Sequence, residues 1–506
     1  MHFKLSSLPC ALVFGLGVTA AALPPATNGE FCTESASPDN SSVSTNSATA
    51  FALIYGYPLV LYVQTFVPTL QAVGANAILN EKTPAYANIE VLVRPNVDTL
   101  YSRAAIDLSQ TDVVLSIPKV PEDRFYVVPF NDLYGNNFAN IGSISSSPAG
   151  DYLLTVAGDD EPGILLAGEG YESDKYTGII KFPGIYGSIM MRIVIKNNGT
   201  DLDEVHAIQD QVSMATVERE GEPLGACLTP GLLGNSALSP AAFLLPFNLS
   251  TTQTTQTLQM LAKVHASNPP IIKSDAERVN TMLAAAGIKD GQYTVPAKID
   301  YTQVHKLIGE QFLALLDPSN HAFDQSGWFV LLPSLSGNFG VEYTARAWIA
   351  WFGYLQLADY IAAYPTYLDP TLPATQITLQ LAANESYIMT FSEKPPVTGF
   401  WSLTAYNETN YLVANGQNVY SLGDRSNLTY ADGTTQVYAD ASSSGAFSIL
   451  IQPAEVTPSA NWTSNWLPGP AGGGIFTVNL RWYGPTESLL NGSYVYPIVS
   501  KQAAIV

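Results

Sequence analysis

The order of strand-like and helix-like segments constrains the fold of this chain more than any other feature. Short runs rich in β-branched and aromatic residues, separated by Gly, Pro, Asn and Asp, occur in two groups, near the start and near the end. Such runs are typical of strands joined by turns and indicate an antiparallel sandwich or barrel. Longer segments with helical apolar spacing lie between the two groups. We therefore expect a β-domain, a helical connector and a second β-domain.

Changes in composition set the domain boundaries. The first β-rich domain spans residues 48–200 and opens with an apolar helical segment in which Pro58 should kink or restart the helix. The helical connector spans 201–370, and the C-terminal β-domain spans 371–506. The expected strands are 89–93, 100–106, 113–117, 125–130, 152–156, 188–195, 387–391, 400–406, 447–451 and 475–483. The expected connector helices are 202–214, 251–265, 274–286, 302–316 and 342–363.

The first residues are typical of a secretory signal peptide. A basic start is followed by the apolar run 8–18 and by small residues ahead of Leu23. We expect residues 1–22 to be removed, and the Ser-, Thr- and Pro-rich residues 23–47 to form a flexible tether. The protein should then be extracellular or associated with a cell wall. No later apolar run is judged long enough to span a membrane, so no membrane partner is expected.

Cysteines and glycosylation motifs agree with an oxidising, extracellular compartment. Cys32 and Cys227 remain after loss of the signal peptide and could form one disulfide, with two unrelated thiols as the alternative. Eight Asn-x-Ser/Thr motifs favour a eukaryotic, fungal-like glycoprotein with surface loops at these positions. The acceptors are Asn40, Asn198, Asn248, Asn384, Asn407, Asn427, Asn461 and Asn491.

Composition and missing motifs exclude several classes of function. The net charge of −21 and the lack of a Lys/Arg cluster argue against a nucleic-acid partner. The chain has no nucleophile elbow, phosphate-binding loop, zinc-protease motif or Cys-x-x-Cys. Its few histidines are widely spaced, so a His-rich metal centre is not expected. No cofactor is evident from the sequence.

Polar residues concentrate at the expected strand ends between Arg94 and Gly142. Asp98, Asp107 and Asp132 fall at neighbouring strand ends, where two carboxylates could converge and perform acid and base chemistry. The structural alternative is that Asn and Asp only form turns and that an Arg only fixes a loop. As catalytic candidates we select Asp98, Asp132 and Tyr101, and as substrate-binding candidates Arg94, Asn96, Tyr134 and Arg192.

The C-terminal domain contains a second group of candidates. Trp401 and Arg481 lie in strand-like runs in which aromatic residues alternate with small ones. Packing in a core explains such aromatic residues without a ligand. Arg481 is different, because an arginine that points inward from a strand needs a partner. Trp401 and Arg481 are therefore added to the substrate-binding candidates.

The order of these motifs resembles a known family. Asn96-x-Asp98-Thr99-Leu100-Tyr101-Ser102, Asp132-x-Tyr134 and Arg192 are similar to the domain of unknown function 1254. The run Phe400-Trp401-Ser402, the segment Asn465-Trp466-Leu467-Pro468 and Arg481-x-Tyr483 are similar to the domain of unknown function 1214. The two domains occur together in bacterial and fungal proteins. The resemblance implies two jelly-roll-like β-sandwich domains joined by helices, often in a homo-oligomer, and it implies no activity.

Three functions fit the sequence. The first is a secreted enzyme with carboxylate-based, hydrolase-like or lyase-like chemistry on a small organic or carbohydrate substrate. The second is a non-catalytic binding or structural glycoprotein of the cell exterior. The third is a tailoring isomerase or cyclase of secondary metabolism, which needs a shaped pocket more than a strong base.

Overall fold

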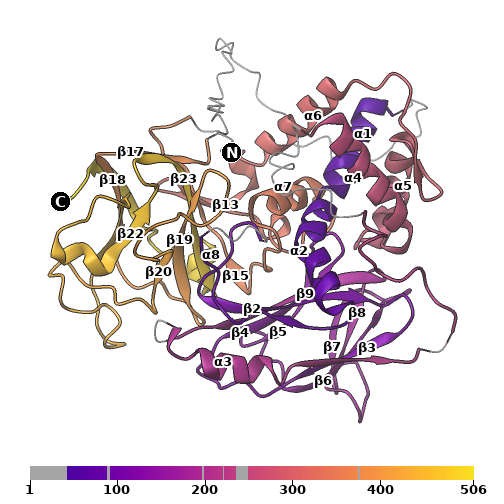
Figure 1. Cartoon of the computed structure of the whole chain (residues 1–506), viewed down its shortest axis with the longest axis horizontal. Helices are drawn as coiled ribbons and strands as arrows, with labels where there is room; N and C mark the ends of the chain where they lie inside the picture. Colours follow the sequence, from indigo (N-terminus) through magenta and orange to yellow (C-terminus); the bar gives the residue numbers. More distant parts are fainter. Residues whose placement is uncertain (1–42, 88–91, 197–198, 220, 235–248, 374–375) are drawn as a thin grey trace, which may run out of the picture. The chain divides into compact units, whose positions relative to one another are not determined.

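Two five-stranded sheets form the N-terminal β-region of the computed structural model, which describes residues 43–87, 92–196, 199–219, 221–234, 249–373 and 376–506 (Figure 1). The first sheet is antiparallel throughout, in the order β1 (Leu79–Asn80), β2 (Thr99–Asp107), β9 (Tyr186–Val194), β4 (Tyr126–Asp132) and β5 (Asn137–Gly142). The second has the order β10 (Ser213–Val217), β3 (Asp112–Ile117), β6 (Gly150–Val156), β8 (Gly178–Phe182) and β7 (Gly163–Leu166). Its strands pair antiparallel except β6 and β8, which are parallel.

The first sheet is covered on both faces. Successive side chains of a strand point to opposite faces, and Leu100 and Ala104 of β2 belong to an apolar core that also includes Leu115 and Phe182 of the second sheet. Tyr101 is adjacent to Leu100 and so points to the opposite face, where it belongs to a second core formed with the helices. Burial on both faces explains why β2, β4 and β9 are buried along their whole length.

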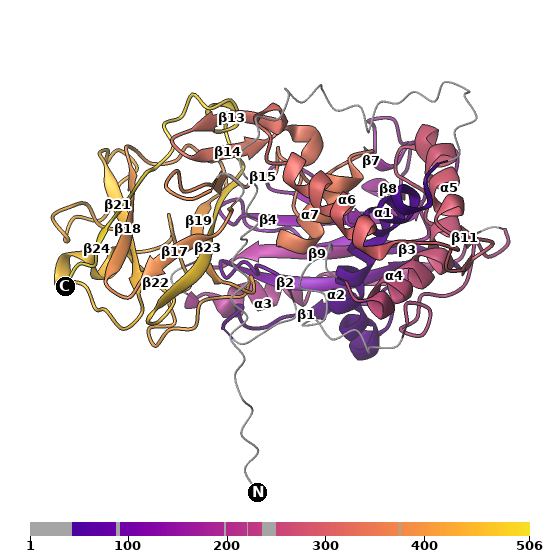
Figure 2. The same ribbon diagram turned by 90° about the horizontal axis from the view of Figure 1, so that it is seen from above.

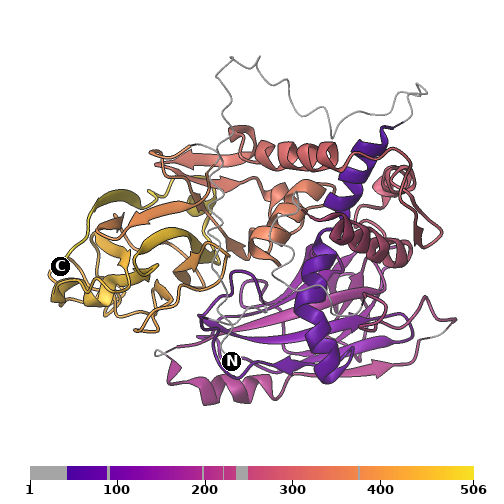
Figure 3. The same ribbon diagram turned by 45° about the horizontal axis from the view of Figure 1, so that its top comes forward.

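The N-terminal helices and four connector helices pack together on one face of the first sheet (Figures 1 and 3). The N-terminal pair α1 (Thr45–Gly56) and α2 (Pro58–Val73) shares a core with the connector helices, and the hydroxyl of Tyr62 donates to the carbonyl of Gly187 on β9. Pro58 restarts the helix at the first position of α2. The N-terminal helices therefore pack with the connector as well as with the first β-domain. The connector helices are α4 (Thr251–Val264), α5 (Ala276–Ala285), α6 (Tyr301–Ala314) and α7 (Tyr343–Gly353).

The stretch Thr45–Val73 corrects the expectation that no later segment is long enough to cross a membrane. By length and composition it passes that test, since it has 29 residues and its most apolar window of 18 residues has a mean hydropathy of 1.5. However, 89% of its most apolar window is buried inside the protein. Its apolar surface is thus used in the core between the helices and the first sheet.

Two connector segments end earlier than their apolar spacing suggests. The helix expected over 202–214 stops as α3 (Leu202–Gln209), and the chain then extends into β10, which pairs with β3. The helix expected over 342–363 stops at Gly353, and Leu355 adopts a left-handed backbone with φ 59°. Sheet pairing and this turn override local helical spacing. The second break places residues 354–366 beside the cavity described below.

The C-terminal β-region contains a five-stranded and a four-stranded sheet. The five-stranded sheet has the order β15 (Ala362–Ala363), β23 (Gly473–Tyr483), β19 (Trp401–Asn407) and β20 (Ser421–Gly423), with β17 (Leu379–Ala382) also paired to β23. The four-stranded sheet has the order β22 (Trp466–Gly469), β21 (Phe447–Pro453), β18 (Glu385–Phe391) and β24 (Ile498–Ala503); only β21 and β22 pair in parallel. One apolar core includes residues of both sheets, among them Met389, Leu403 and Ile449.

Small elements complete the molecule. A three-stranded sheet of β13 (His321–Gln325), β14 (Trp328–Leu331) and β16 (Thr366–Tyr367) lies near α7 (Figure 2). A hairpin of β11 (Ile288–Lys289) and β12 (Gln292–Tyr293) follows α5, and α8 (Glu487–Leu490) follows β23. The fold is thus α+β and mostly β, with several antiparallel sheets.

Candidate active site

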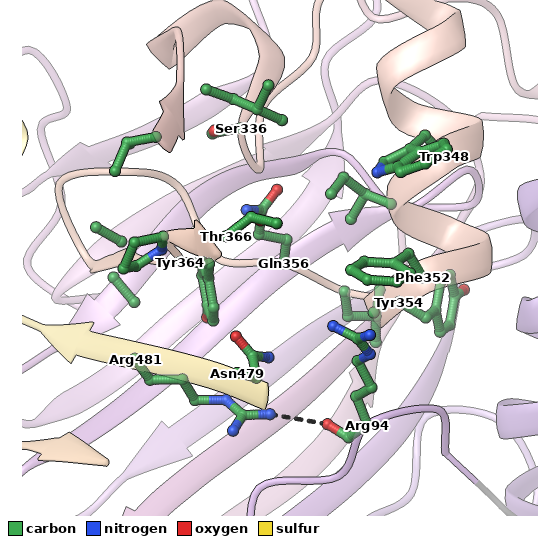
Figure 4. A pocket seen from close by; sticks show the side chains of 18 of the residues that line it. Arg94, Ser336, Trp348, Phe352, Tyr354, Gln356, Tyr364, Thr366, Asn479 and Arg481 are labelled. Carbon is green, nitrogen blue, oxygen red and sulfur yellow. Dashed lines mark hydrogen bonds between the residues drawn. The ribbon is translucent and has the colours of Figure 1, made fainter. Parts of the chain in front are cut away.

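A cavity of about 80 Å³ lies where the first sheet, the end of α7 and strand β23 meet (Figure 4). A single buried water needs roughly 10–15 Å³ on the same measure, so the cavity has room for a small organic molecule. Five of the sequence-predicted residues line it: Arg94, Asn96, Tyr101, Arg192 and Arg481. Segments hundreds of residues apart in the chain therefore contribute to one site.

The turn that precedes β2 supplies the first of these residues. Arg94 has a left-handed backbone, φ 47°, and its N–H donates to the carbonyl of Asn410 at 3.0 Å. The side-chain oxygen of Asn96 accepts the N–H of Asp98 at 2.6 Å, as in an Asx turn, and the Asn96 amide donates to the Tyr483 hydroxyl at 2.6 Å. The turn is therefore held both by its own side chains and by the C-terminal β-region.

Arg481 on β23 reaches the same turn from the other side. Its guanidinium donates to the backbone carbonyl of Arg94 at 3.0 Å, to the Tyr406 hydroxyl at 2.6 Å and to the Thr404 hydroxyl at 2.9 Å. The inward-pointing arginine thus has partners, as its position in a strand requires. All three partners are electrically neutral.

Tyr101 and Arg192 are directly opposite each other on β2 and β9. The guanidinium carbon of Arg192 lies 5.9 Å from the centre of the Tyr101 ring, and Arg192 donates to the carbonyl of Leu355 at 2.9 Å. The Tyr101 hydroxyl accepts the N–H of Asn96 at 2.8 Å. Burial raises the pKa of Tyr101, partly opposed by Arg192, so the phenol keeps its proton at neutral pH.

The side chain of Arg94 lies under the aromatic end of α7. Its guanidinium carbon is 3.3 Å from the centre of the Phe352 ring, and its nitrogens donate to the Asn410 side chain at 3.0 Å and to the Thr477 hydroxyl at 2.8 Å. Burial lowers the pKa of Arg94 to about 9, with Tyr406 opposing and Arg481 adding to the shift. The side chain is still charged at neutral pH.

Several residues of the cavity wall escaped the sequence analysis. Trp348 and Phe352 lie within the helix expected over 342–363 and were not among the candidates, and Tyr364 follows the unexpected break after α7. Burial raises the pKa of Tyr364 to about 12, while Arg192 and Arg481 oppose the rise. Asn479 could have been found, because it lies two residues before Arg481 and thus on the same face of β23. Figure 4 shows Asn479 between Arg481 and Arg94.

Asp98 and Asp132 do not converge, and this part of the sequence interpretation is wrong. Asp98 precedes Thr99, which pairs with Val194 at one end of β9, whereas Asp132 pairs with Gly187 at the other end. At about 3.4 Å per residue, the two carboxylates lie roughly 25 Å apart along the sheet. Because β2 and β4 both run antiparallel to β9, the start of β2 and the end of β4 lie at opposite ends of the sheet, and neither aspartate lines the cavity.

Asp98 joins the two family-like regions instead. Its carboxylate is 2.8 Å from the guanidinium of Arg425 and accepts the Ser421 hydroxyl at 3.1 Å. Arg425 also pairs with Asp424 at 2.8 Å and stacks over Phe400, with 4.1 Å from the guanidinium carbon to the ring centre. The structural alternative, an aspartate that fixes a loop through an arginine, describes this geometry.

Asp132 organises a tight turn away from the cavity. It accepts the N–H groups of Tyr134 and Asn136 at 2.9 Å each, and the Asn136 side-chain amide at 2.6 Å. Burial raises the pKa of Asp132, against the effect of Arg346 and of these hydrogen bonds. Tyr134 donates from its hydroxyl to the carbonyl of Asn268 and lies outside the cavity lining.

The remaining candidates also lie outside the cavity lining. Trp401 is buried in the C-terminal core, and its indole donates to the Tyr438 hydroxyl at 2.7 Å. Cys227 is exposed with a free thiol, whereas Cys32 lies outside the described residues, so their pairing stays a prediction. Within the described ranges, no group of three or more His, Cys, Asp or Glu side chains is placed to hold a metal ion.

Two family models match the chain. Residues 75–216 match "Protein of unknown function (DUF1254)", and residues 375–487 match "Protein of unknown function (DUF1214)". No protein with a curated description matches. The first matched segment contains the turn before β2 and Arg192, and the second contains Arg481.

Two solved structures of bacterial proteins match this chain. The crystal structure of the VPA0106 protein from Vibrio parahaemolyticus is 18% identical, covers 90% of this chain and 99% of its own, and has a TM-score of 0.58. A putative uncharacterized protein from Burkholderia cenocepacia is 10% identical, covers 91% of this chain and 94% of its own, and has a TM-score of 0.42. The first similarity shows a shared fold.

Proposed function

The chain belongs to the family that pairs the domains of unknown function 1254 and 1214, and we propose that it binds a small organic molecule in the cavity between the two domains. The descriptions of these domains assign no activity, so the proposal rests on the site itself. One observation carries this proposal. Arg94, Asn96, Tyr101 and Arg192 of the first matched segment and Arg481 of the second line one cavity. Convergent polar groups beside an apolar wall are typical of a ligand site.

Filling the cavity tests the proposal. Asn479 is half-buried on the cavity wall, and Asn479→Trp should occupy the space needed by a ligand. Ile475→Trp changes a residue of the same strand that is 40% exposed and serves as the control. We expect ligand-observed NMR with neutral, cationic and anionic small compounds to find binders whose signals persist with the control and vanish with Asn479→Trp. Binding unaffected by Asn479→Trp, or no binder of any charge, would refute a cavity ligand.

Conversion of the bound molecule is a second candidate, favoured by the position of Tyr101. Its hydroxyl accepts a hydrogen bond from the Asn96 N–H, so its own proton is free to be donated to a ligand beside Arg192. This supports a lyase-, hydrolase- or isomerase-like reaction in which Tyr101 is the general acid. An Asp98–Asp132 pair is not part of this proposal. Tyr101→Phe should abolish turnover of an identified ligand while binding persists; a pure binding protein would show no turnover in either form.

We further propose a secreted, N-glycosylated, fungal-like protein. The motif asparagines that the structure describes in the last quarter support this, because Asn384, Asn427, Asn461 and Asn491 are exposed. Asn40, Asn198 and Asn248 lie outside the described residues. Expression of the full chain in a eukaryotic host should release protein that begins after residue 22, as read by N-terminal sequencing of the medium fraction.

The finer architecture is part of the proposal as well. Each β-region has one apolar core that includes residues of two sheets, which supports two β-sandwich, jelly-roll-like domains. The family resemblance supports a homo-oligomer. Light scattering coupled to size-exclusion chromatography should then give a mass that is a multiple of that of one chain.

A further inference from the structure

The three arginines of the cavity are buried without a carboxylate. Arg94, Arg192 and Arg481 are 7%, 5% and 3% exposed. Their hydrogen-bond partners are amides, hydroxyls and carbonyls. Within the part of the chain that the structure describes, no ion pair involves any of the three. The Nε group of Arg192 is buried and has no hydrogen-bond partner at all.

Two buried arginines elsewhere in the chain do have a carboxylate partner. Arg124 pairs with Asp201 at 2.6 Å, and Arg103 lies 3.1 Å from a carboxylate oxygen of Glu81. Arg346 is a further buried arginine without an ion pair among the described residues, and its guanidinium lies against the rings of Tyr55, Tyr134 and Tyr343. An unpaired charge in a protein interior is costly, and among the described residues three such arginines gather around this one cavity. A negative group in the cavity would compensate these charges.

The surroundings of the cavity do not supply that counterpart. Asp359 lines the wall, but it is only partly buried, and its carboxylate accepts the N–H of Tyr360. Repulsion between neighbouring guanidinium groups is also present, since Arg481 adds to the lowering of the Arg94 pKa. A bound anion would relieve both the burial of charge and this repulsion.

The opposite part of the wall is apolar and aromatic. Trp348, Ile349 and Phe352 of α7 and Leu331 of β14 line it. Phe352 lies above Arg94 in Figure 4, at the junction between the charged and the apolar part. A molecule that fits both parts has one anionic group and a small carbon skeleton, and the volume of about 80 Å³ limits it to a few heavy atoms.

We propose that the cavity binds a small organic carboxylate, whose carboxylate group contacts Arg192 and Arg481 and whose carbon skeleton lies against Trp348 and Phe352. This inference rests on the proposed function and names the ligand class of the same cavity. A carboxylate fits the fork of an arginine with two parallel hydrogen bonds. It is favoured over phosphate because Ile349, Phe352 and Leu331 of the wall have no donor for further anionic oxygens.

Propionate and propionamide form the decisive pair of probes, because they share a shape and differ in charge. We expect sodium propionate to raise the melting temperature of the full chain in a saturable way, and propionamide to have no effect at equal ionic strength. Arg192→Met should weaken the apparent affinity for propionate by about tenfold or more, as expected for a lost charge-assisted hydrogen bond. Arg278→Met, at an arginine exposed on α5, is the control and should keep the response.

Arg481→Met tests the second arginine that contacts the carboxylate. If Arg481→Met does not fold, Arg192→Met still tests the inference. An equal response to propionate in Arg192→Met would overturn the inference, because the anion would then bind elsewhere. Tighter binding of methylphosphonate than of propionate would overturn the carboxylate assignment. If propionamide or another neutral compound binds in an Asn479-dependent manner and propionate does not, the cavity ligand stands and the carboxylate class is overturned.

Discussion

Arg481 donates a hydrogen bond from its guanidinium to the backbone carbonyl of Arg94, over 3.0 Å and 387 residues of sequence. The contact joins a strand of the C-terminal sheet to the turn that opens β2. Around it, Asn96 contacts Tyr483 and Asp98 contacts Arg425. The same short turn thus holds the two domains together and lines the cavity.

Asp98→Asn should destabilise the protein without closing the cavity. The substitution removes the charge that pairs with Arg425 at a side chain that is only 13% exposed. We expect a loss of about 1–3 kcal/mol in the free energy of unfolding, measured by urea denaturation. Asp123→Asn, which removes an exposed partner of Lys196, is the control and should leave the urea midpoint unchanged. An unchanged midpoint for Asp98→Asn would contradict a structural role of the pair.

Asp132→Asn should destabilise the turn after β4. The NH2 group that replaces Oδ2 of Asp132 cannot accept the hydrogen bond from the Asn136 side-chain amide. We expect a loss of about 1–3 kcal/mol in the free energy of unfolding, measured by urea denaturation. The exchange of both residues, Asp132→Asn with Asn136→Asp, should recover part of the loss because donor and acceptor are restored. If the double variant is no more stable than the single one, the hydrogen bond is not the cause.

Asp424 should make stability depend on pH. Burial raises its pKa to about 6, with Arg425 opposing, from an ordinary value of 3.8. Between these two values the folded state holds the proton and the unfolded state has lost it, so this group favours folding at pH 4 and loses that advantage as the pH rises to 6. Two pKa units correspond to a change of up to about 3 kcal/mol.

Asp424→Asn should remove this contribution. Urea midpoints of the native chain and of the variant, measured from pH 4 to 7, should converge or cross, with the native chain losing stability relative to the variant as the pH rises. Parallel curves would show that Asp424 titrates with an ordinary pKa in the folded protein.

Glycan mapping should distinguish the described motif asparagines by exposure. Asn384, Asn427, Asn461 and Asn491 are exposed, whereas Asn407 is half-buried at the end of β19, and its side-chain oxygen accepts the N–H groups of Thr409 and Tyr411. We predict that mass spectrometry of the protein from a eukaryotic host finds glycans at the four exposed positions and not at Asn407. A fully occupied Asn407 would contradict this ranking.

Much of the fold follows from local sequence patterns. The strand expected over 100–106 is β2, Thr99–Asp107, because alternation and turn residues are local signals. The end of α7 at Gly353 was not predicted, since the apolar spacing continues past it and only tertiary packing decides the break. The early end of α3 has the same cause.

The candidate site was predictable in part. Arg94 and Asn96 lie in the turn before β2 and Tyr101 lies near the start of β2, so a local pattern was sufficient to find them. Arg481 was selected because an inward arginine needs a partner, but its partner at Arg94 follows only from the tertiary structure. The Asp98–Asp132 pair failed because strand register, which no local pattern contains, places them at opposite ends of β9.

The contact between Arg94 and Arg481 also has a consequence for synthesis. A ribosome that adds about 5–20 residues per second needs roughly 20–80 seconds between these two positions. During that time the turn before β2 exists without the strand that completes its cavity. A nascent or truncated chain that ends before β23 should therefore be unable to bind the ligand, however well its N-terminal sheets have folded, and activity should appear only when nearly the whole chain has been made.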